Sequence, residues 1–191
     1  SLTNVRYNGA ILVNDEGNRF VNELSLTPIL GKAIKDQKGG HAFLIFDQAS
    51  IDRAALMKKY KAAGYFTEAA TIEELAKKLG INPQNLEKTV ALYRKGMDDG
   101  VDHEFGRKDS RFSRIDKAPY YGAKISPASQ TTYGGVKIDL DARAVDKNNK
   151  PIPGLYASGE AAAQYGQGVS IGVILGKLAA DTAAEDIKKM K

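Results

Sequence analysis

Apolar and polar positions follow two different patterns along the chain, and the pattern changes near residue 118. Before it, apolar residues at helical spacing predict helices over about 28–37, 71–79 and 83–99. Apolar runs bounded by glycine and turn residues predict a β-hairpin over 9–22 and a buried strand over 41–46. The first part of the chain is therefore expected to mix helices with strands.

Two of these helices carry capping signals at their starts. Thr71 precedes one helix with Glu74 three positions later, which is a capping box. Asn82 and Pro83 place a cap and then a proline at the first position of the next helix. Its buried stripe is expected to contain Leu86, Val90, Tyr93 and Met97. Asp47 or Ser50 is expected to cap a further helix that follows the buried strand. The two helices at 71–99 are expected to pack as a pair with a structural role.

The second part of the chain reads as short β-type segments followed by one long helix. The segments are "YYGAKI", "GGVKIDL", "RAVD" and "GLYAS", separated by turns. A helix is predicted from about Ser170 to Lys189. Its apolar side is expected to contain Ile171, Ile174, Leu175, Leu178 and Ala179. The fold class is α+β, and the best boundary lies at 125/126.

Composition excludes several functional classes. The chain has 28 Lys plus Arg and 23 Asp plus Glu, a net charge of +5. The basic residues alternate with acids on helix faces, which is typical of a solvated surface and not of a nucleic-acid partner. With no cysteine and two distant histidines, no metal site is expected. No apolar run approaches the roughly 20 residues of a membrane span.

A glycine cluster near the end of the chain is the first candidate for chemistry. Gly166, Gly168 and Gly172 form G-x-G-x-x-x-G running into the long helix. Backbone N–H groups at such a helix start can bind a phosphate or an electron-rich ring oxygen. The dinucleotide fingerprint requires G-x-G-x-x-G directly after a strand, and this spacing is one residue longer. By itself the cluster is compatible with a binding turn or with an ordinary loop-to-helix junction.

The order of segments around this cluster has a specific resemblance. The stretch "APYYGAKISPASQTTYGGVKIDLDARAVDKNNKPIPGLYASGEAA" resembles the C-terminal part of one flavoprotein superfamily. That superfamily contains soluble fumarate reductases, succinate dehydrogenase flavoprotein subunits, urocanate reductase and 3-oxosteroid Δ1-dehydrogenases. In the first part, "NGAILVNDEGNRFVNE" resembles the opening of its capping domain, and "DHEFGRKD" resembles a polar stretch late in that domain.

The resemblance implies a two-part architecture. Residues 1–125 would form a mixed α+β capping domain that closes over a small-molecule substrate. Residues 126–191 would form the strand-rich C-terminal segment of a split FAD-binding, Rossmann-like domain with one long terminal helix. The first segment of that domain, which carries the dinucleotide fingerprint, does not match any part of this chain. The chain is therefore expected to be an inactive fragment of an FAD enzyme that binds no metal.

The resemblance also implies which residues contact FAD. Gly159 and Glu160 would lie by the ribityl and ribose region, and Gly134 would lie in a turn close to the ring. The turn into the long helix would direct N–H groups at the pyrimidine edge of the flavin. Its residues are Gly168, Ser170, Ile171, Gly172 and Val173. Each of these glycines is also explained by a tight turn.

Several active-site positions of the family are changed in this chain. Fumarate reductases clamp the dicarboxylate with Arg and His, and an Arg delivers a proton. Arg6 matches the relay Arg of the family. The remaining positions hold other residues. Thr3 replaces the relay Glu, and Thr27 replaces the proton-donor Arg. Gln130 or Thr131 falls at the position of the clamp His, and Val169 falls at or near that of the clamp Arg. Charge-assisted hydrogen bonds contribute about 1.5–3 kcal/mol each, so fumarate is not the expected substrate.

The glycine turn has a second partial likeness. "GQGVSIG" is similar to the G-P-G-A-T-I-G turn of the oxosteroid dehydrogenases, where a backbone N–H and a nearby Tyr polarise the substrate carbonyl. Gly168 matches the backbone donor. Tyr165 lies one residue from the tyrosine position, so it either polarises a carbonyl or packs beneath the cap.

These residues lead to one functional expectation and one alternative. The parent protein is expected to move a hydride across an activated carbon–carbon bond, by enoate or enone reduction or the reverse dehydrogenation, with an electron donor or acceptor still to be identified. The alternative is a non-catalytic flavin- or ligand-binding module derived from the same family. Family members occur in the cytoplasm and in the cell envelope, so the resemblance is compatible with either compartment.

Overall fold

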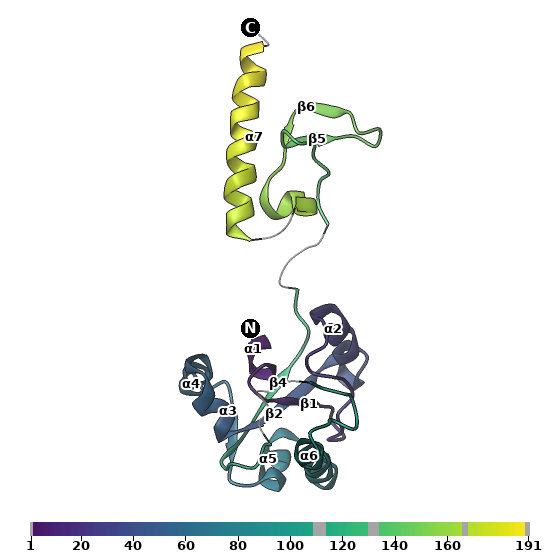
Figure 1. The fold of residues 1–191 in the computed structure, drawn as a ribbon, viewed down its shortest axis with the longest axis vertical. Helices are drawn as coiled ribbons and strands as arrows, with labels where there is room; N and C mark the ends of the chain where they lie inside the picture. Colours follow the sequence, from purple (N-terminus) through teal and green to yellow (C-terminus); the bar gives the residue numbers. More distant parts are fainter. Residues whose placement is uncertain (1, 109–113, 130–133, 166–167, 190–191) are drawn as a thin grey trace. The chain divides into compact units, whose positions relative to one another are not determined.

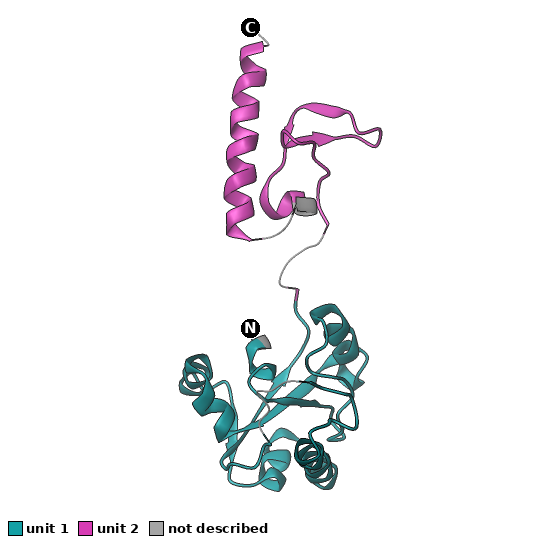
Figure 2. Cartoon of the chain, in the orientation of Figure 1, with its two compact units in different colours: residues 1–128 teal, residues 129–191 magenta. Residues whose placement is uncertain are grey.

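The structure is a computed structural model that describes residues 2–108, 114–129, 134–165 and 168–189 (Figure 1). The chain divides into two compact units, Ser1–Ala128 and Ser129–Lys191 (Figure 2). The unit boundary lies three residues beyond the boundary expected from sequence, and the mixed α+β class is confirmed. The assignment of the units to a capping domain and a flavin-domain segment stays a prediction.

The first unit contains one antiparallel sheet and several helices. The strands run in the order β1-β2-β4-β3. They are β1 (Ile11–Val13), β2 (Ala42–Asp47), β3 (Thr67–Ala69) and β4 (Tyr120–Ile125). The helices are α1 (Thr3–Arg6), α2 (Thr27–Lys35), η1 (Lys38–Gly40), α3 (Gln48–Arg53), α4 (Ala55–Ala62), α5 (Ile72–Leu79) and α6 (Pro83–Asp98).

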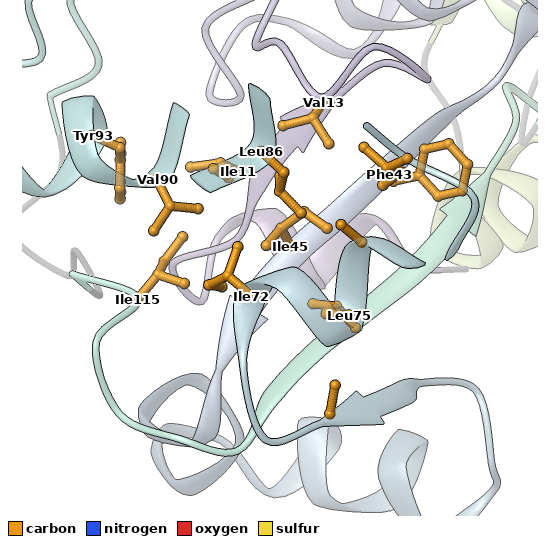
Figure 3. Packing of buried hydrophobic residues seen from close by; sticks show 13 residues of the cluster. Ile11, Val13, Phe43, Ile45, Ile72, Leu75, Leu86, Val90, Tyr93 and Ile115 are labelled. Atoms are coloured by element: carbon orange, nitrogen blue, oxygen red, sulfur yellow. The ribbon is translucent and has the colours of Figure 1, made fainter. Parts of the chain in front are cut away.

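Strand β2 is the centre of this unit, because side chains on both of its faces are buried. Phe43 and Ile45 point into a core that α5 and α6 cover (Figure 3). Leu44 and Phe46 point into a second core on the opposite face, which helices α1 to α4 cover. This alternation is the period of two expected for a strand. The continuous apolar run at 41–46 therefore predicted the buried strand correctly.

The helix caps predicted from sequence are confirmed. The backbone N–H of Glu74 donates to Thr71 Oγ1 at 3.1 Å, at the start of α5. Asn82 Oδ1 accepts from the N–H of Asn85 at 3.0 Å, at the start of α6. Asp47 Oδ1 accepts from the N–H of Ser50 at 3.2 Å, at the start of α3. Helices α5 and α6 pack side by side on one face of the sheet, as expected of a structural pair.

The hairpin predicted over 9–22 is wrong in its pairing. Strand β1 pairs with β2, with Leu12 opposite Leu44, and the expected second arm makes a single isolated bridge between Val13 and Arg19. The turn itself forms, but its Gly17 carbonyl accepts from Thr89 Oγ1 of α6 at 2.7 Å. The turn thus packs on a distant helix, and the chain beyond it leaves the sheet.

The second unit contains a β-hairpin and a long helix. Its elements are β5 (Arg143–Val145), β6 (Pro151–Tyr156), η2 (Gly159–Tyr165) and α7 (Val169–Lys189). The predicted terminal helix is confirmed, whereas the strand predicted in "GGVKIDL" is reduced to one bridge between Ile138 and Ala144. Asp186 of α7 accepts from Arg143 Nε at 2.8 Å and from Tyr156 Oη at 3.0 Å, which ties the hairpin to the helix.

The apolar side predicted for α7 is only partly buried. Leu175, Leu178 and Ala179 pack against a small core of Ile138, Ala142 and Ala162. Ile174, on the same predicted apolar side, is 62% exposed within this unit. The short hairpin covers one side of α7 and leaves the other side uncovered in this unit.

A membrane-spanning helix and a metal-binding cluster of side chains are both absent from the described ranges. No helix there combines the length and the apolar character that crossing a membrane requires. In the same ranges, no group of three or more His, Asp and Glu side chains has the geometry to hold a metal ion.

Candidate functional site

The start of α7 lies directly against the backbone of η2. A Cβ built on Gly159 would lie 3.4 Å from Gly172 Cα, and a Cβ built on Gly172 would lie 3.9 Å from Gly159 Cα. One turn further along, a Cβ on Gly176 would lie 3.8 Å from Ser158 Oγ. Gly159 also has φ +59°, in the left-handed region that favours glycine. Gly159 and Gly172 therefore let the helix approach η2 closely, which is a packing role as well as a candidate binding role.

Gly168 has a different environment. Its φ is +101°, and no atom of the described residues lies within 4 Å of the position that a Cβ would take. Its carbonyl accepts from the N–H of Gly172 at 3.1 Å, so Gly168 precedes the first turn of α7. The N–H groups of that first turn have no intrahelical acceptor, because a helix start leaves its first donors without partners. Open space beside aligned donors forms a cradle suited to a phosphate or to the polar edge of a ring.

The remaining cofactor-binding candidates gather at the same end of the second unit. The N–H of Val136 donates to the Ala161 carbonyl at 2.7 Å, which places the segment with Gly134 alongside η2. Glu160 is exposed on η2. Ser170 and Val173 are exposed and Ile171 is partly buried, all within the first turns of α7. The structure thus brings together the predicted FAD-binding positions of the second unit.

Some predicted positions lie outside the part that the structure describes. These are the side chains of Thr3 and Tyr165 and the residues Gln130, Thr131 and Gly166. The proposed role of Tyr165 as a carbonyl-polarising phenol therefore stays a prediction. The packing alternative for Tyr165 also stays open.

Arg6 is the predicted site residue of the first unit, and its guanidinium organises a loop. It is 2% exposed and ends α1. Its Nη1 donates to the carbonyls of Glu23 at 2.5 Å and Ser25 at 2.9 Å. Its Nη2 donates to Tyr7 Oη at 2.6 Å and lies 3.4 Å from Thr27 Oγ1. Arg6 thus fixes the path of residues 23–27 and reaches the hydroxyl of Thr27.

The electrostatic setting of Arg6 follows from its burial. Burial lowers the pKa of the Arg6 guanidinium, Tyr7 opposes this shift, and the nearby Arg107 cation adds to it. An arginine in this situation remains protonated, because its ordinary pKa lies so high. Its Nε is buried without a hydrogen-bond partner among the described residues. Arg6 is therefore a fixed cation that donates hydrogen bonds and is poorly suited to releasing a proton itself.

Behind this loop lies a buried ionic cluster that the sequence did not reveal. Arg19 donates to Glu23 through Nε at 2.9 Å and Nη2 at 3.0 Å. The same guanidinium donates to both oxygens of Asp102, at 2.8 and 2.9 Å. Arg107 Nη1 contacts Glu23 Oε2 at 3.2 Å, and Arg107 Nη2 donates to the Arg6 carbonyl at 3.0 Å. The cluster ties the loop at 102–107 to the end of α1 and so to Arg6.

The Asp102 carboxylate of this cluster is held ionised by its partners. Burial alone would raise the pKa of Asp102, but hydrogen bonds from Arg19 and from the N–H groups of Arg107 and Glu104 bring the pKa to about 2. Burial would likewise lower the pKa of Arg19, and its bonds to Asp102 and Glu23 raise that pKa overall. The cluster is a paired, hydrogen-bonded set of charges, which is the form that buried charges require.

In the second unit, a glycine-lined helix start presents N–H groups that can bind a nucleotide cofactor. The model of the FAD binding domain family matches residues 2–172 of this chain. The chain therefore belongs to this FAD-binding family, and the resemblance stated from its sequence is confirmed. FAD is the cofactor that the family indicates, and the open cradle at Gly168 fits it.

Relatives of known type agree with this assignment. The probable fumarate reductase Ifc3 of Shewanella frigidimarina is 35% identical over 188 residues, which is 95% of this chain and 32% of that protein. The urocanate reductase of Eggerthella lenta is 35% identical over 162 residues, 81% of this chain and 27% of that protein. The open conformation of a flavocytochrome c3 fumarate reductase has a TM-score of 0.82 and 34% identity, covering 96% of this chain and 34% of that chain. This chain spans about a third of the length of these relatives.

Proposed function

We propose that the parent protein is an FAD-dependent oxidoreductase that moves a hydride across an activated carbon–carbon double bond, or catalyses the reverse dehydrogenation. Residues 1–125 would supply its capping domain and residues 126–191 the C-terminal segment of its FAD-binding domain. The observation that carries the proposal is the cradle at Gly168, with φ +101° and open space where a Cβ would lie, in a chain of an FAD-binding family.

The residues of this chain would perform two tasks in that reaction. When bound, FAD supplies hydride transfer. The N–H groups at the start of α7 would bind the flavin edge and stabilise negative charge on it through the helix dipole. In the first unit, Arg6 would hold the 23–27 loop in place beside the substrate. Leu26 is 74% exposed and Ile29 is 55% exposed beside Thr27, so this loop presents an apolar surface.

The substrate proposal follows from the side chains at the proton-donor and clamp positions. Thr27 matches the proton-donor Arg of the fumarate reductases, Val169 falls at or near their clamp Arg, and neither side chain can pair with a carboxylate. In the second unit, Val169 is 85% exposed at the start of α7. In the first unit, Leu26 and Ile29 are exposed apolar side chains near Thr27. We therefore propose an enone or a monocarboxylic enoate as substrate and not fumarate itself.

The second unit has a surface that fits a role as part of a larger domain. Four of its large apolar side chains are markedly exposed: Leu140 85%, Val169 85%, Val173 66% and Ile174 62%. A folded domain seldom exposes so many large apolar groups unless a partner surface covers them. The proposal is that a further segment of the FAD-binding domain, from outside residues 1–191, covers this surface and completes the FAD site. The chain by itself would then not catalyse.

A non-catalytic flavin-binding module is the second candidate. It is favoured by Thr3, Thr27 and Val169, because none of them can perform the acid or cation role of the matching family residue. Such a module would keep the FAD cradle at Gly168 and lose the chemistry.

The test is an acceptor panel with the full-length gene product. The protein would be reduced without oxygen, and oxidation of its flavin would be followed after adding cyclic enones, monocarboxylic enoates or fumarate. The proposal expects oxidation by an enone or enoate at least about tenfold faster than by fumarate, because each lost charge-assisted bond costs more than 1.4 kcal/mol. Fumarate reduction at the highest rate of the panel would overturn the substrate proposal. Bound FAD that no acceptor oxidises would favour the binding module.

The split FAD site has its own test. FAD would be titrated into residues 1–191 and into the full-length product, with flavin fluorescence as the readout. Weak binding by this chain and tight binding by the full-length product are expected. Equally tight binding by both would contradict the split site.

A further inference from the structure

Tyr7 lies next to Arg6, and no sequence motif indicates a role for it. Its hydroxyl accepts from Arg6 Nη2 at 2.6 Å, and Arg6 Cζ lies 4.3 Å from the centroid of its ring. The same Nη2 lies 3.4 Å from Thr27 Oγ1. A phenol, a guanidinium and a threonine hydroxyl are therefore grouped around one nitrogen atom. Tyr7 is the phenol beside the position from which the family is expected to deliver a proton.

Exposure separates the three groups. Arg6 is 2% exposed, whereas Tyr7 is partly exposed and Thr27 is exposed. Arg6 also uses Nη1 on the two carbonyls of Glu23 and Ser25, so its role in holding the loop is already set. The groups that can reach a substrate are the two hydroxyls, and a phenol is far more acidic than an aliphatic alcohol. Tyr7 is thus the better proton donor of the two.

The hydrogen-bond geometry leaves the Tyr7 proton available. A phenol has one O–H donor and lone pairs that accept, and Arg6 has donors only. Because Tyr7 Oη accepts from Arg6, its own O–H is directed elsewhere. Loss of that proton would leave a phenolate 2.6 Å from a permanent cation, as a charge-assisted hydrogen bond. The pair therefore stabilises the charge that proton donation would create.

We propose that Tyr7 is the group that gives a proton to the α-carbon of the substrate, with Arg6 as its positioning residue. This rests on the proposed function. In the reductive direction the β-carbon gains a hydride from reduced FAD, and the π electrons of the double bond move to the α-carbon. A new C–H bond forms there as the Tyr7 O–H bond breaks, and the phenolate stays paired with Arg6. The flavin is oxidised by two electrons, the substrate is reduced by two, and solvent returns the proton to Tyr7. The dehydrogenation uses the same atoms in reverse.

The test compares Tyr7→Phe with the unchanged full-length holoenzyme, using an acceptor that the unchanged protein reduces. The substitution keeps the ring over Arg6 and removes only the hydroxyl. Loss of a general acid slows the step by about 10²–10⁴-fold, so flavin oxidation by the acceptor is expected to slow within that range. FAD content, thermal midpoint and the dissociation constant of the acceptor should stay unchanged, because the hydroxyl binds neither the cofactor nor the loop carbonyls.

A second readout follows the proton without net oxidation or reduction. The oxidised holoenzyme would be incubated with the saturated product in D₂O, and deuterium at the α-carbon would be measured by NMR. The unchanged protein should exchange that position, and Tyr7→Phe should lose the exchange. A purely structural Tyr7 would leave both the exchange and the oxidation rate within about twofold of the unchanged protein, and that result would overturn the inference.

Two controls make the outcome specific. Tyr65→Phe makes the same change at a tyrosine that is 58% exposed and packs against Tyr60, so its rates should match those of the unchanged protein. Thr27→Val removes the other hydroxyl near Arg6 and should slow the reaction far less than Tyr7→Phe. A larger loss in Thr27→Val than in Tyr7→Phe would assign the proton to Thr27 and overturn the inference. If no acceptor oxidises the flavin of the unchanged protein, the proposed function is contradicted. That result is distinguishable from a failure of the Tyr7 proposal, in which the unchanged protein and Tyr7→Phe react at similar rates.

Discussion

At the residue scale, the charges behind the 23–27 loop decide how firmly Arg6 is held. The side chains of Arg19 and Glu23 are fully buried, and that of Asp102 is 2% exposed. Arg107 extends the cluster to the carbonyl of Arg6. Removal of one member leaves a buried charge without its partner, which costs much more than the pair contributed. The cluster thus links the stability of the first unit to the geometry of the candidate site.

Asp102→Ala is the variant that tests this link. We expect the free energy of unfolding of the first unit to fall by about 3–5 kcal/mol, because Arg19 would stay buried without its two hydrogen bonds to Asp102. Asp99→Ala is the matched control, since Asp99 is 44% exposed and pairs with His103 on the surface; it should cost about 1 kcal/mol or less. Urea unfolding followed by circular dichroism measures both. Equal losses in the two variants would contradict the role assigned to the cluster.

The same carboxylate predicts a pH dependence. The pKa of Asp102 is about 2 in the folded protein and 3.8 ordinarily, so it is lowered by folding. In such a case the unfolded chain binds more protons between these values, and stability rises with pH. The contribution of Asp102 is full above pH 3.8 and is lost as pH falls toward 2. The gap in unfolding free energy between the unchanged protein and Asp102→Asn should narrow over that window. A gap of constant size from pH 5 to pH 2, roughly the window of acid unfolding, would contradict this assignment.

At the element scale, the start of α7 combines tight packing with an open cradle. Gly159 of η2 and Gly172 of α7 lie against each other, whereas no atom of the described residues lies within 4 Å of the Cβ position of Gly168. The helix is held at its other end by the bonds from Arg143 and Tyr156 to Asp186. An anchored helix with a free first turn presents its N–H groups in a fixed direction, as binding an extended ring system requires.

Gly168→Ala tests the cradle against a matched control. At φ +101° an alanine is strained, and a cost of about 1–2 kcal/mol in stability is expected. Gly64→Ala introduces similar strain at φ +74°, also with open space around its Cβ position. Gly64 lies in a turn of the first unit, whereas the predicted FAD contacts begin at Gly134 in the sequence. Both variants should lose similar stability, and only Gly168→Ala should weaken FAD binding by the full-length protein, by about tenfold or more. Equal FAD affinities in the two variants would show that Gly168 is an ordinary junction.

At the scale of the whole molecule, the two units differ in how complete their cores are. The first unit buries two separate apolar clusters, one on each face of its sheet. Among its described residues, the second unit has one small buried apolar cluster, made of Ile138, Ala142 and Ala162, and leaves several large apolar side chains exposed. A core of that size supplies little stability to 63 residues, because small domains bury too small a fraction of their surface.

This difference predicts how the units behave when separated. Residues 1–128 should fold alone and unfold in one cooperative transition, because their cores are closed on both faces of the sheet. Residues 129–191 alone should bind a hydrophobic dye and lack a cooperative transition. Differential scanning calorimetry and dye fluorescence measure these outcomes. A sharp thermal transition in the isolated second unit would contradict the proposal that another segment of the FAD-binding domain covers it.

The predictions that succeeded from sequence depend on neighbours close in the chain. A cap such as Thr71 is recognised within three positions of its acceptor, and the buried strand at 41–46 is recognised from its own apolar run. The resemblance that indicated FAD rests on the order of short segments, and the family match confirms it, whereas the individual FAD contacts stay predictions. The prediction of a hairpin at 9–22 was wrong in its pairing because β1 pairs with β2, which lies some thirty positions later in the chain.

The sequence by itself determined the helices, the buried strand, the α+β class, the family and its cofactor, because local residue patterns or the order of segments indicate each of these. Only the tertiary structure decided which side chains meet: Arg19 with Asp102 across 83 positions, Arg107 with the Arg6 carbonyl across 101, and Arg6 with Thr27 across 21. Such contacts leave no periodic signal, since they depend on the path of the whole chain. For the same reason Tyr7 emerged as a candidate proton donor only when the fold placed its hydroxyl against Arg6 beside Thr27.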